Sequence, residues 1–246
     1  MEPVQTLADA IEHAARAWPR RECLVVWSSR HDRIVDRVTF SALRARAEAA
    51  LSQLRAHGLT APGVRVAVAS SPTVAYYVCA AAVLLGGGTI VNVNYRTPPE
   101  VFGAAVVAAG AQLFVTSAAH AKVVAAARAA EASGSLAALT LLELDGAGPL
   151  GLNTRDGAVP APSMPVPAGS AAHSAAHSAA SRSGIAPDAV AAIMFTSGST
   201  GAPKAVPLTH GGLLWSCRAK LRTHGGLAAF GPSATSDAPQ PSGTLR

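Results

Sequence analysis

Residues 64–94 read Val64-Arg-Val-Ala-Val-Ala-Ser-Ser-Pro-Thr-Val-Ala-Tyr-Tyr-Val-Cys-Ala-Ala-Ala-Val-Leu-Leu-Gly-Gly-Gly-Thr-Ile-Val-Asn-Val-Asn94. The first part, Val64–Ala69, has the length and β-branched content of a buried strand. Ser71 followed by Pro72 begins a helix that runs to Leu85, and Thr89–Val93 is a second strand. Strand, helix and strand of these lengths form a βαβ unit, whose two strands run parallel in one sheet.

The same alternation precedes this unit. A helix over Leu7–Trp18 is expected with Thr6 as its cap, followed by short strands at Cys23–Trp27 and Ile34–Phe40. The next segment places its apolar residues on one helical face, with Gly58 where such a helix ends; that face consists of Leu43, Ala47, Ala50, Leu51 and Leu54.

The alternation also continues after this unit. Thr97-Pro98-Pro99-Glu100 has the form of a capping box with proline at the first helical position, which predicts a helix over Val101–Ala109. The elements expected next are a strand at Leu113–Thr116, a helix at Ala119–Ala132 and a strand at Leu139–Leu144. The fold class is therefore α/β, with a mainly parallel sheet covered by helices on both faces.

An uncharged segment, Val66–Tyr95, raises the alternative of a membrane span. Its continuous apolar run is only Val74–Leu85 and ends at three glycines, whereas a span needs about 20 predominantly apolar residues. We therefore expect a buried core helix and no membrane span.

Composition excludes several classes of protein. Half of the 246 residues are apolar and 14% are charged, which is sufficient for a packed core and excludes a wholly disordered chain. The net charge of +6 comes from arginines scattered along helix faces, without a basic stripe interleaved with aromatics, so no nucleic-acid partner is expected. Three widely spaced cysteines and the absence of a secretory signal predict reduced thiols and a cytoplasmic location.

The chain divides into four parts. Residues 1–148 carry the α/β pattern. Residues 149–187 are rich in proline and in a Ser-Ala-Ala-His repeat, which predicts a low-complexity linker or insertion. His173 and His177 could share a helix face as metal ligands, but no third ligand is near, and we interpret them as solvated. Residues 188–224 are predicted to form a strand hairpin and a last helix, and residues 225–246 are predicted to be a disordered tail.

One segment carries chemistry. The strand Ala189–Phe195 is followed by Thr196-Ser-Gly-Ser-Thr-Gly-Ala-Pro-Lys204, and Ala205–Leu208 can return as a second strand. The two glycines let backbone N–H groups turn around an anion, the hydroxyls add donors, and Lys204 supplies a charge for phosphate oxygens. The spacing is that of neither a Walker A loop nor G-x-G-x-x-G. The alternative is an ordinary surface turn.

The run from Ile193 to His210 closely resembles the signature phosphate loop of the acyl-adenylate-forming (AMP-binding) superfamily, which comprises acyl-CoA synthetases, peptide-synthetase adenylation domains and luciferases. Weaker resemblances cover residues 38–68 and 84–100. The resemblance implies that the nucleotide-binding residues are Thr196, Ser197, Gly198, Ser199, Thr200, Gly201 and Lys204. Ala205 departs from the family's usual glycine.

By this resemblance such an enzyme uses ATP and Mg²⁺ to convert a carboxylic acid to an acyl-adenylate, and then passes the acyl group to coenzyme A or a carrier thiol. The family's later metal, ribose and lysine motifs are not found in this chain, and Asp237 is its only acidic residue after Asp188. We therefore expect the incomplete N-terminal part of the large domain of an AMP-forming acid ligase, without a metal site and inactive alone. The alternatives are a non-catalytic nucleotide-binding or dimerising decoy of a full-length relative, and a shortened product without an independent role.

Three residues beside or within the last helix receive structural interpretations. We expect His210 to cap or pack at the start of that helix rather than to act in chemistry. We expect Trp215 and Cys217 to lie in the core, because free cysteines are usually buried and inert.

Overall fold

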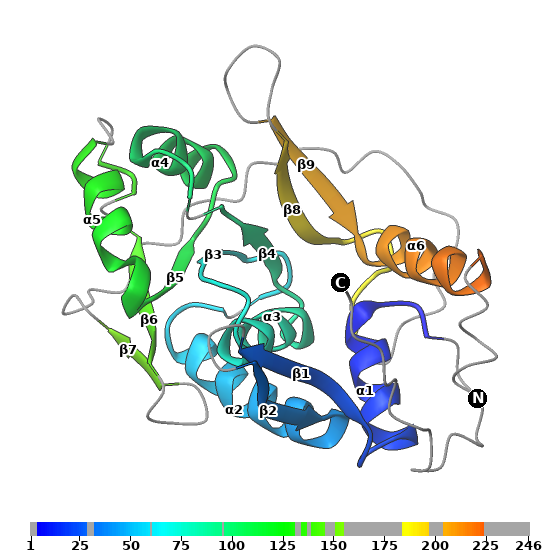
Figure 1. The fold of residues 1–246 in the computed structure, drawn as a ribbon. Coiled ribbons are helices and arrows are strands. Elements are labelled where there is room, and N and C mark those ends of the chain that lie inside the picture. Colours follow the sequence, from blue (N-terminus) through cyan, green and yellow to red (C-terminus); the bar gives the residue numbers. More distant parts are fainter. Residues whose placement is uncertain are drawn as a thin grey trace.

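The computed structural model of the protein describes residues 4–28, 32–59, 61–94, 96–130, 134–136, 139–145, 151–154, 184–196 and 204–223. Its main sheet is built from β3 (Arg65–Ala69), β4 (Thr89–Asn92), β5 (Leu113–Ser117), β6 (Thr140–Asp145), β7 (Gly151–Thr154), β8 (Val190–Thr196) and β9 (Lys204–Thr209). The seven strands lie in the order β7-β6-β5-β3-β4-β8-β9 (Figure 1). Only the edge strands, β7 and β9, are antiparallel to their neighbours, which confirms the mainly parallel sheet.

Helices cover both faces of this sheet (Figure 1). They are α1 (Leu7–Ala17), α2 (Phe40–Ala56), α3 (Val74–Leu85), α4 (Pro99–Ala108) and α5 (Ala121–Ala130). Val66 and Val68 of β3 pack in one core with α2 and α3, whereas Ala67 and Ala69 pack in a second core with α4 and α5. Because successive side chains of a strand point to opposite faces, β3 is buried on both sides and contributes to both cores.

The crossover connections explain which helix lies on which face. β3 has β4 on one side and β5 on the other, so the chain first moves one way through α3 and then back across β3 through α4. Right-handed crossovers in opposite directions put their helices on opposite faces. The strand order therefore reverses between β3 and β5, and ligands of open α/β sheets bind beyond the carboxyl ends of strands at such a point.

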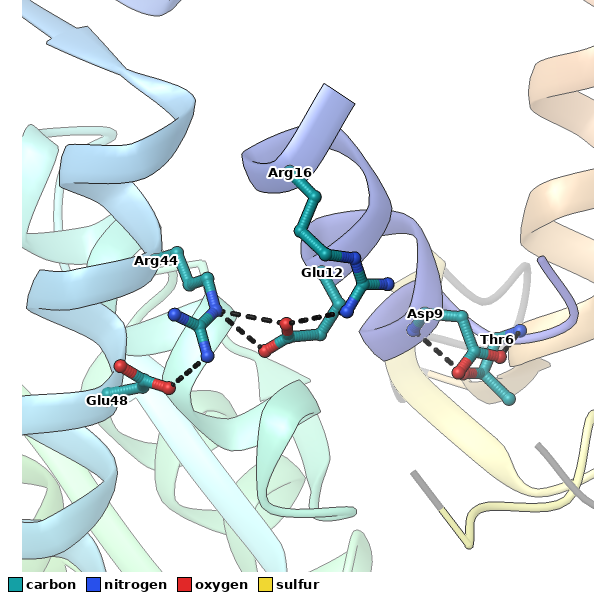
Figure 2. A network of polar contacts seen from close by, with 6 residues as sticks. All are labelled: Thr6, Asp9, Glu12, Arg16, Arg44 and Glu48. Atoms are coloured by element: carbon teal, nitrogen blue, oxygen red, sulfur yellow. Dashed lines mark hydrogen bonds and ion pairs between the residues drawn. The ribbon is translucent and has the colours of Figure 1, made fainter. Parts of the chain in front are cut away.

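The first helix, α1, is fixed by polar contacts at its start and along its length (Figure 2). The Asp9 amide donates to Thr6 Oγ1 and the Thr6 amide donates to an Asp9 carboxylate oxygen, which confirms Thr6 as the cap and completes a capping box. Arg44 of α2 then joins Glu12 of α1, at 2.9 Å, to Glu48. These pairs are partly exposed, so each is worth about 0.2–1 kcal/mol and serves to orient α1 on α2.

The first two predicted strands are present but lie outside the main sheet. β1 (Glu22–Ser28) and β2 (Arg33–Thr39) pair with each other as an antiparallel two-stranded sheet. Thr39 then caps α2, since its hydroxyl accepts from the amide of Ala42. The hairpin leaves Trp27 57% exposed.

Two helix starts differ from the sequence prediction. α3 begins at Val74, because Thr73 rather than Ser71 is the cap. The capping box expected at Thr97 does not form: α4 begins at Pro99, Pro98 is its N-cap, and no side chain caps it. A residue that precedes proline is kept out of the helical region, and Pro98 accordingly has an extended ψ of 143°.

The uncharged segment is a core helix, as expected. α3 buries Val78, Cys79 and Val83, and it ends before Gly87, whose φ of +75° suits glycine. Burial raises the pKa of the Cys79 thiol to about 12, so this thiol is not a nucleophile at neutral pH. None of the helices in the described part of the chain is long and apolar enough to cross a membrane.

Two of the four predicted parts of the chain contribute strands to the sheet that the first part builds. Strand β7 pairs with β6 although its residues lie in the range 149–187, and β8 and β9 join the sheet built from the first part. Residues 155–183, which include His173 and His177, and the predicted tail at 225–246 lie outside the described residues.

The packing of the second core leads to a prediction about the free energy of unfolding. Phe102 of α4 is fully buried with its ring centroid 5.7 Å from that of Phe114 on β5. Phe102→Ala should therefore lower the free energy of unfolding by about 3–5 kcal/mol, through lost burial and the cavity left behind. Urea denaturation followed by circular dichroism measures this change. Val35→Ala, at a half-exposed position of β2, is the control and should change stability by no more than about 0.5 kcal/mol. Equal effects of the two substitutions would contradict the assigned core.

Candidate functional site

The predicted phosphate-loop hairpin is formed by β8 and β9, which pair in antiparallel register from Val190↔Thr209 to Thr196↔Lys204. Thr196 and Lys204 thus lie opposite each other at the end of the paired region that residues 197–203 connect, and both are exposed. Ser197, Gly198, Ser199, Thr200 and Gly201 lie outside the described residues. The structure therefore places the first and last residues of the predicted nucleotide-binding set side by side on adjacent strands.

The sheet places this hairpin end at its carboxyl edge. β8 runs parallel to β4, with Ile90 opposite Ala192 and Val91 opposite Ile193. The hydroxyl of Thr89, which is 2% exposed, donates to the Val190 carbonyl at 2.7 Å and locks the start of β8 against β4. Thr196, at the end of β8, therefore lies at the edge where every parallel strand ends, which is where α/β proteins bind ligands.

Tyr76 and Asn92 connect the hairpin to α3. Asn92 ends β4, and its amide Nδ2 lies 3.1 Å from Met194 Sδ on β8. The Tyr76 hydroxyl of α3 donates to Asn92 Oδ1. Burial, followed by the neighbouring Tyr77 and Cys79, raises the pKa of Tyr76, so its hydroxyl keeps the proton that it donates.

Sequence analysis did not single out Tyr76 or Asn92 as part of this site. The one signal in the sequence was Asn92, a polar residue at the end of an otherwise apolar strand. That signal was insufficient, because only the sheet order brings β4 next to β8.

A helix, α6 (His210–Thr223), follows the hairpin directly. Thr209 acts as its cap, since its hydroxyl accepts from the amide of Gly212 at 3.1 Å. Gly211 allows a close approach of chains: its amide donates to the Pro187 carbonyl, and a Cβ at this position would lie 3.1 Å from that oxygen.

His210 has the packing role expected for it. It is fully buried, and its Nδ1 accepts a hydrogen bond from the backbone amide of Leu7, at the start of α1, at 3.2 Å. Its own amide donates to the Ala189 carbonyl just before β8. Nε2 has no hydrogen-bond partner among the described residues. Burial lowers the pKa of His210, with Asp9 opposing the shift, so the neutral ring that accepts from Leu7 is favoured.

Trp215 and Cys217 were expected in the core, and this expectation is wrong. Trp215 is 71% exposed and Cys217 is also exposed. The reason is that α6 buries only the side that meets β9 and α1, through His210 and Leu214. Trp215 and Cys217 lie on another part of the helix surface, which these contacts leave exposed.

The donors at the hairpin end fit phosphate oxygens, because a lysine ammonium and a hydroxyl both donate to anions. They do not fit a divalent metal ion, which prefers carboxylate oxygens. Within the described ranges no three His, Cys, Asp or Glu side chains come together as metal ligands. The chemistry of Thr196 and Lys204 is thus that of donors to an anion.

Comparison with known proteins identifies the family to which this chain belongs. The family model for AMP-binding enzymes matches residues 11–236, so this chain belongs to the AMP-binding enzyme family. Feruloyl-CoA synthases of Amycolatopsis sp. and Streptomyces sp. are each 31% identical to it over 180 residues, which are 73% of this chain and 30% of theirs.

Solved structures show the same fold. The crystal structure of IdnL1 has a TM-score of 0.62 at 21% identity and covers 91% of this chain and 37% of its own. A fatty acyl CoA synthetase of Mycobacterium tuberculosis has a TM-score of 0.58 at 22% identity, over 84% of this chain and 35% of its own. The match to the two feruloyl-CoA synthases spans only 30% of the length of those curated relatives.

The buried histidine predicts a pH dependence of stability. Because the pKa of His210 is lower in the folded state than in the unfolded state, the folded state loses stability as pH falls below the unfolded value of about 6.5. We expect the free energy of unfolding to decrease from pH 7.5 to 5.5, and to decrease less in His210→Asn, whose Oδ1 can still accept from the Leu7 amide. Urea denaturation at several pH values measures both slopes. Val35→Ala, at a half-exposed position without a titratable group, is the control and should keep the wild-type slope. An unchanged slope in His210→Asn would contradict the prediction.

Proposed function

We propose that this chain supplies the nucleotide-binding, N-terminal part of an ATP-dependent, AMP-forming carboxylic acid ligase. The proposed reaction joins a carboxylic acid to AMP, releases pyrophosphate, and then passes the acyl group to coenzyme A or a carrier thiol. Membership of the AMP-binding enzyme family and the similarity to feruloyl-CoA synthases support this class of reaction.

The observation that carries the proposal is the register of the hairpin. Thr196 and Lys204 face each other across β8 and β9 at the carboxyl edge of a parallel sheet. They flank the seven residues 197–203, whose glycines and hydroxyls suit a phosphate-binding turn. We propose that Ser197, Gly198, Ser199, Thr200 and Gly201 complete the nucleotide site with Thr196 and Lys204.

The proposed role of these residues follows from where charge develops. When a carboxylate attacks the α-phosphorus, negative charge accumulates on the departing pyrophosphate. Donors held in place before the reaction stabilise that charge without reorganising. The antiparallel pairing of β8 with β9 and the bond from Thr89 to Val190 hold both ends of the turn in this way. Mg²⁺ supplies charge neutralisation in such chemistry when bound, and we assign it no ligand among the described residues.

We further propose that the chain alone binds ATP but does not turn it over. Adenylate formation needs the phosphate turn, a metal carboxylate and ribose contacts in one site. This chain spans 30% of the length of its curated relatives, and its only acidic residue after Asp188 is Asp237. We expect the remaining contacts, those to the acid and the thiol included, to come from further polypeptide.

ATP binding by the chain alone is the first test. Equilibrium dialysis with labelled ATP should detect binding that Lys204→Ala weakens about tenfold or more, through loss of a charged hydrogen-bond donor. Lys122→Ala is the matched control, because Lys122 is exposed on α5, away from the hairpin. Equal binding by the two variants would show that the segment is only a turn.

The second test measures acid-dependent exchange of labelled pyrophosphate into ATP. The chain alone should give no exchange above that of Lys204→Ala. When this chain is fused to the remaining length of a feruloyl-CoA synthase, Lys204→Ala should lower the exchange rate by on the order of 10²–10³. Clear exchange by the chain alone would overturn the proposed inactivity, and unchanged exchange in the fused variant would overturn the role of Lys204.

A further inference from the structure

A second polar group lies where the strand order reverses, at the carboxyl ends of β3 and β5. Ser71 follows β3, and His120 ends the short 3-10 helix η1 (Ala118–His120) that follows β5. Ser71 Oγ and His120 Nε2 are 3.1 Å apart, within hydrogen-bond distance. Both residues are partly exposed. Strand β4 separates this position from the phosphate hairpin.

The backbone around Ser71 is held in place. Its carbonyl accepts from the Ser70 hydroxyl at 3.1 Å and from the Thr73 amide at 2.7 Å. The buried Thr116 of β5 donates its hydroxyl to the Ala69 carbonyl at 3.0 Å, which ties the two strand ends together. Ser71 and His120 thus extend from strand ends that are fixed to each other, as a reacting pair requires.

Two further features suit chemistry at this position. α3, which is 12 residues long, begins three residues after Ser71, and the first amides of a helix have no acceptor within it. The Tyr76 amide is bonded to the Thr73 hydroxyl, and the dipole of α3 favours negative charge near the start of the helix. Glu143 of β6, paired in register with Thr116, places a carboxyl that is only 4% exposed at the same edge.

We propose that Ser71 and His120 form a nucleophile and general-base pair that accepts acyl groups from activated esters or thioesters. His120 Nε2 takes the proton of Ser71 as Oγ forms a bond to the acyl carbon, and the bond to the leaving alcohol or thiol breaks. The imidazolium returns its proton to that leaving group, which leaves an acyl ester on Ser71. Water then attacks the acyl carbon while His120 takes its proton; the bond from the acyl carbon to Ser71 Oγ breaks, the imidazolium returns the proton to Oγ, and the carboxylic acid leaves. This activity is independent of the proposed function of the phosphate hairpin.

A fluorophosphonate probe tests the pair on the full chain, because such probes modify only activated hydroxyls. After proteolysis, mass spectrometry should locate the adduct on Ser71 in the wild-type protein, which requires no variant to fold. His120→Gln should slow labelling at least about 100-fold, the smallest usual contribution of a general base. Ser41→Ala is the matched control, because the Ser41 hydroxyl donates to a backbone carbonyl and has no histidine partner in the described bonds.

Hydrolysis of p-nitrophenyl acetate and of an acetyl thioester provides the second readout. Both rates should fall to background in Ser71→Ala and in His120→Gln, and both should be unchanged in Ser41→Ala. These rates depend on Ser71 and His120, whereas the ATP-binding assay depends on Lys204, so failure of the phosphate site and failure of this pair are distinguishable. Absence of an adduct on Ser71, or equal labelling in His120→Gln, would overturn the proposal and reduce the pair to a structural tie between two loops.

Discussion

The burial of β3 on both faces is the constraint on which the rest of the structure depends. Val66 and Val68 face one core and Ala67 and Ala69 face the other, so helices must cover both sides of the sheet. The connections that contain these helices, from β3 to β4 through α3 and from β4 to β5 through α4, set the order of the strands. The strand order in turn decides which strand ends are neighbours at the carboxyl edge.

The hairpin is tied to parts of the chain far away in sequence. The Thr89 hydroxyl of β4 donates a hydrogen bond to the Val190 carbonyl of β8. His210, at the start of α6, accepts a hydrogen bond from the backbone amide of Leu7. Arg218 of α6 also donates to the Val4 carbonyl at 2.6 Å. The start of α6, and with it the end of β9, is therefore held by the start of α1 as well as by the sheet.

The carboxyl edge of the sheet carries two different kinds of polar group. At β8 and β9 it presents a cation and a hydroxyl, which suit an anion that binds and leaves. At β3 and β5 it presents a hydroxyl and an imidazole within hydrogen-bond distance, which suit proton transfer. Both kinds of group occur at one edge because all the parallel strands end there. The loops that follow the strands are free of the hydrogen-bonding pattern of the sheet, so they can carry different polar residues.

Local patterns in the sequence were sufficient to determine the elements. The apolar faces, the cap at Thr6 and the glycines after α3 predicted most helices and strands, because these signals act over a few residues. The hairpin of β8 and β9 was equally readable, since its residues are contiguous. Only the tertiary structure decided that β1 and β2 leave the main sheet, that Trp215 stays exposed, and that Ser71 meets His120. Those outcomes depend on which distant segments pack together, and residues 49 apart acquire a common site only when two parallel strands become neighbours.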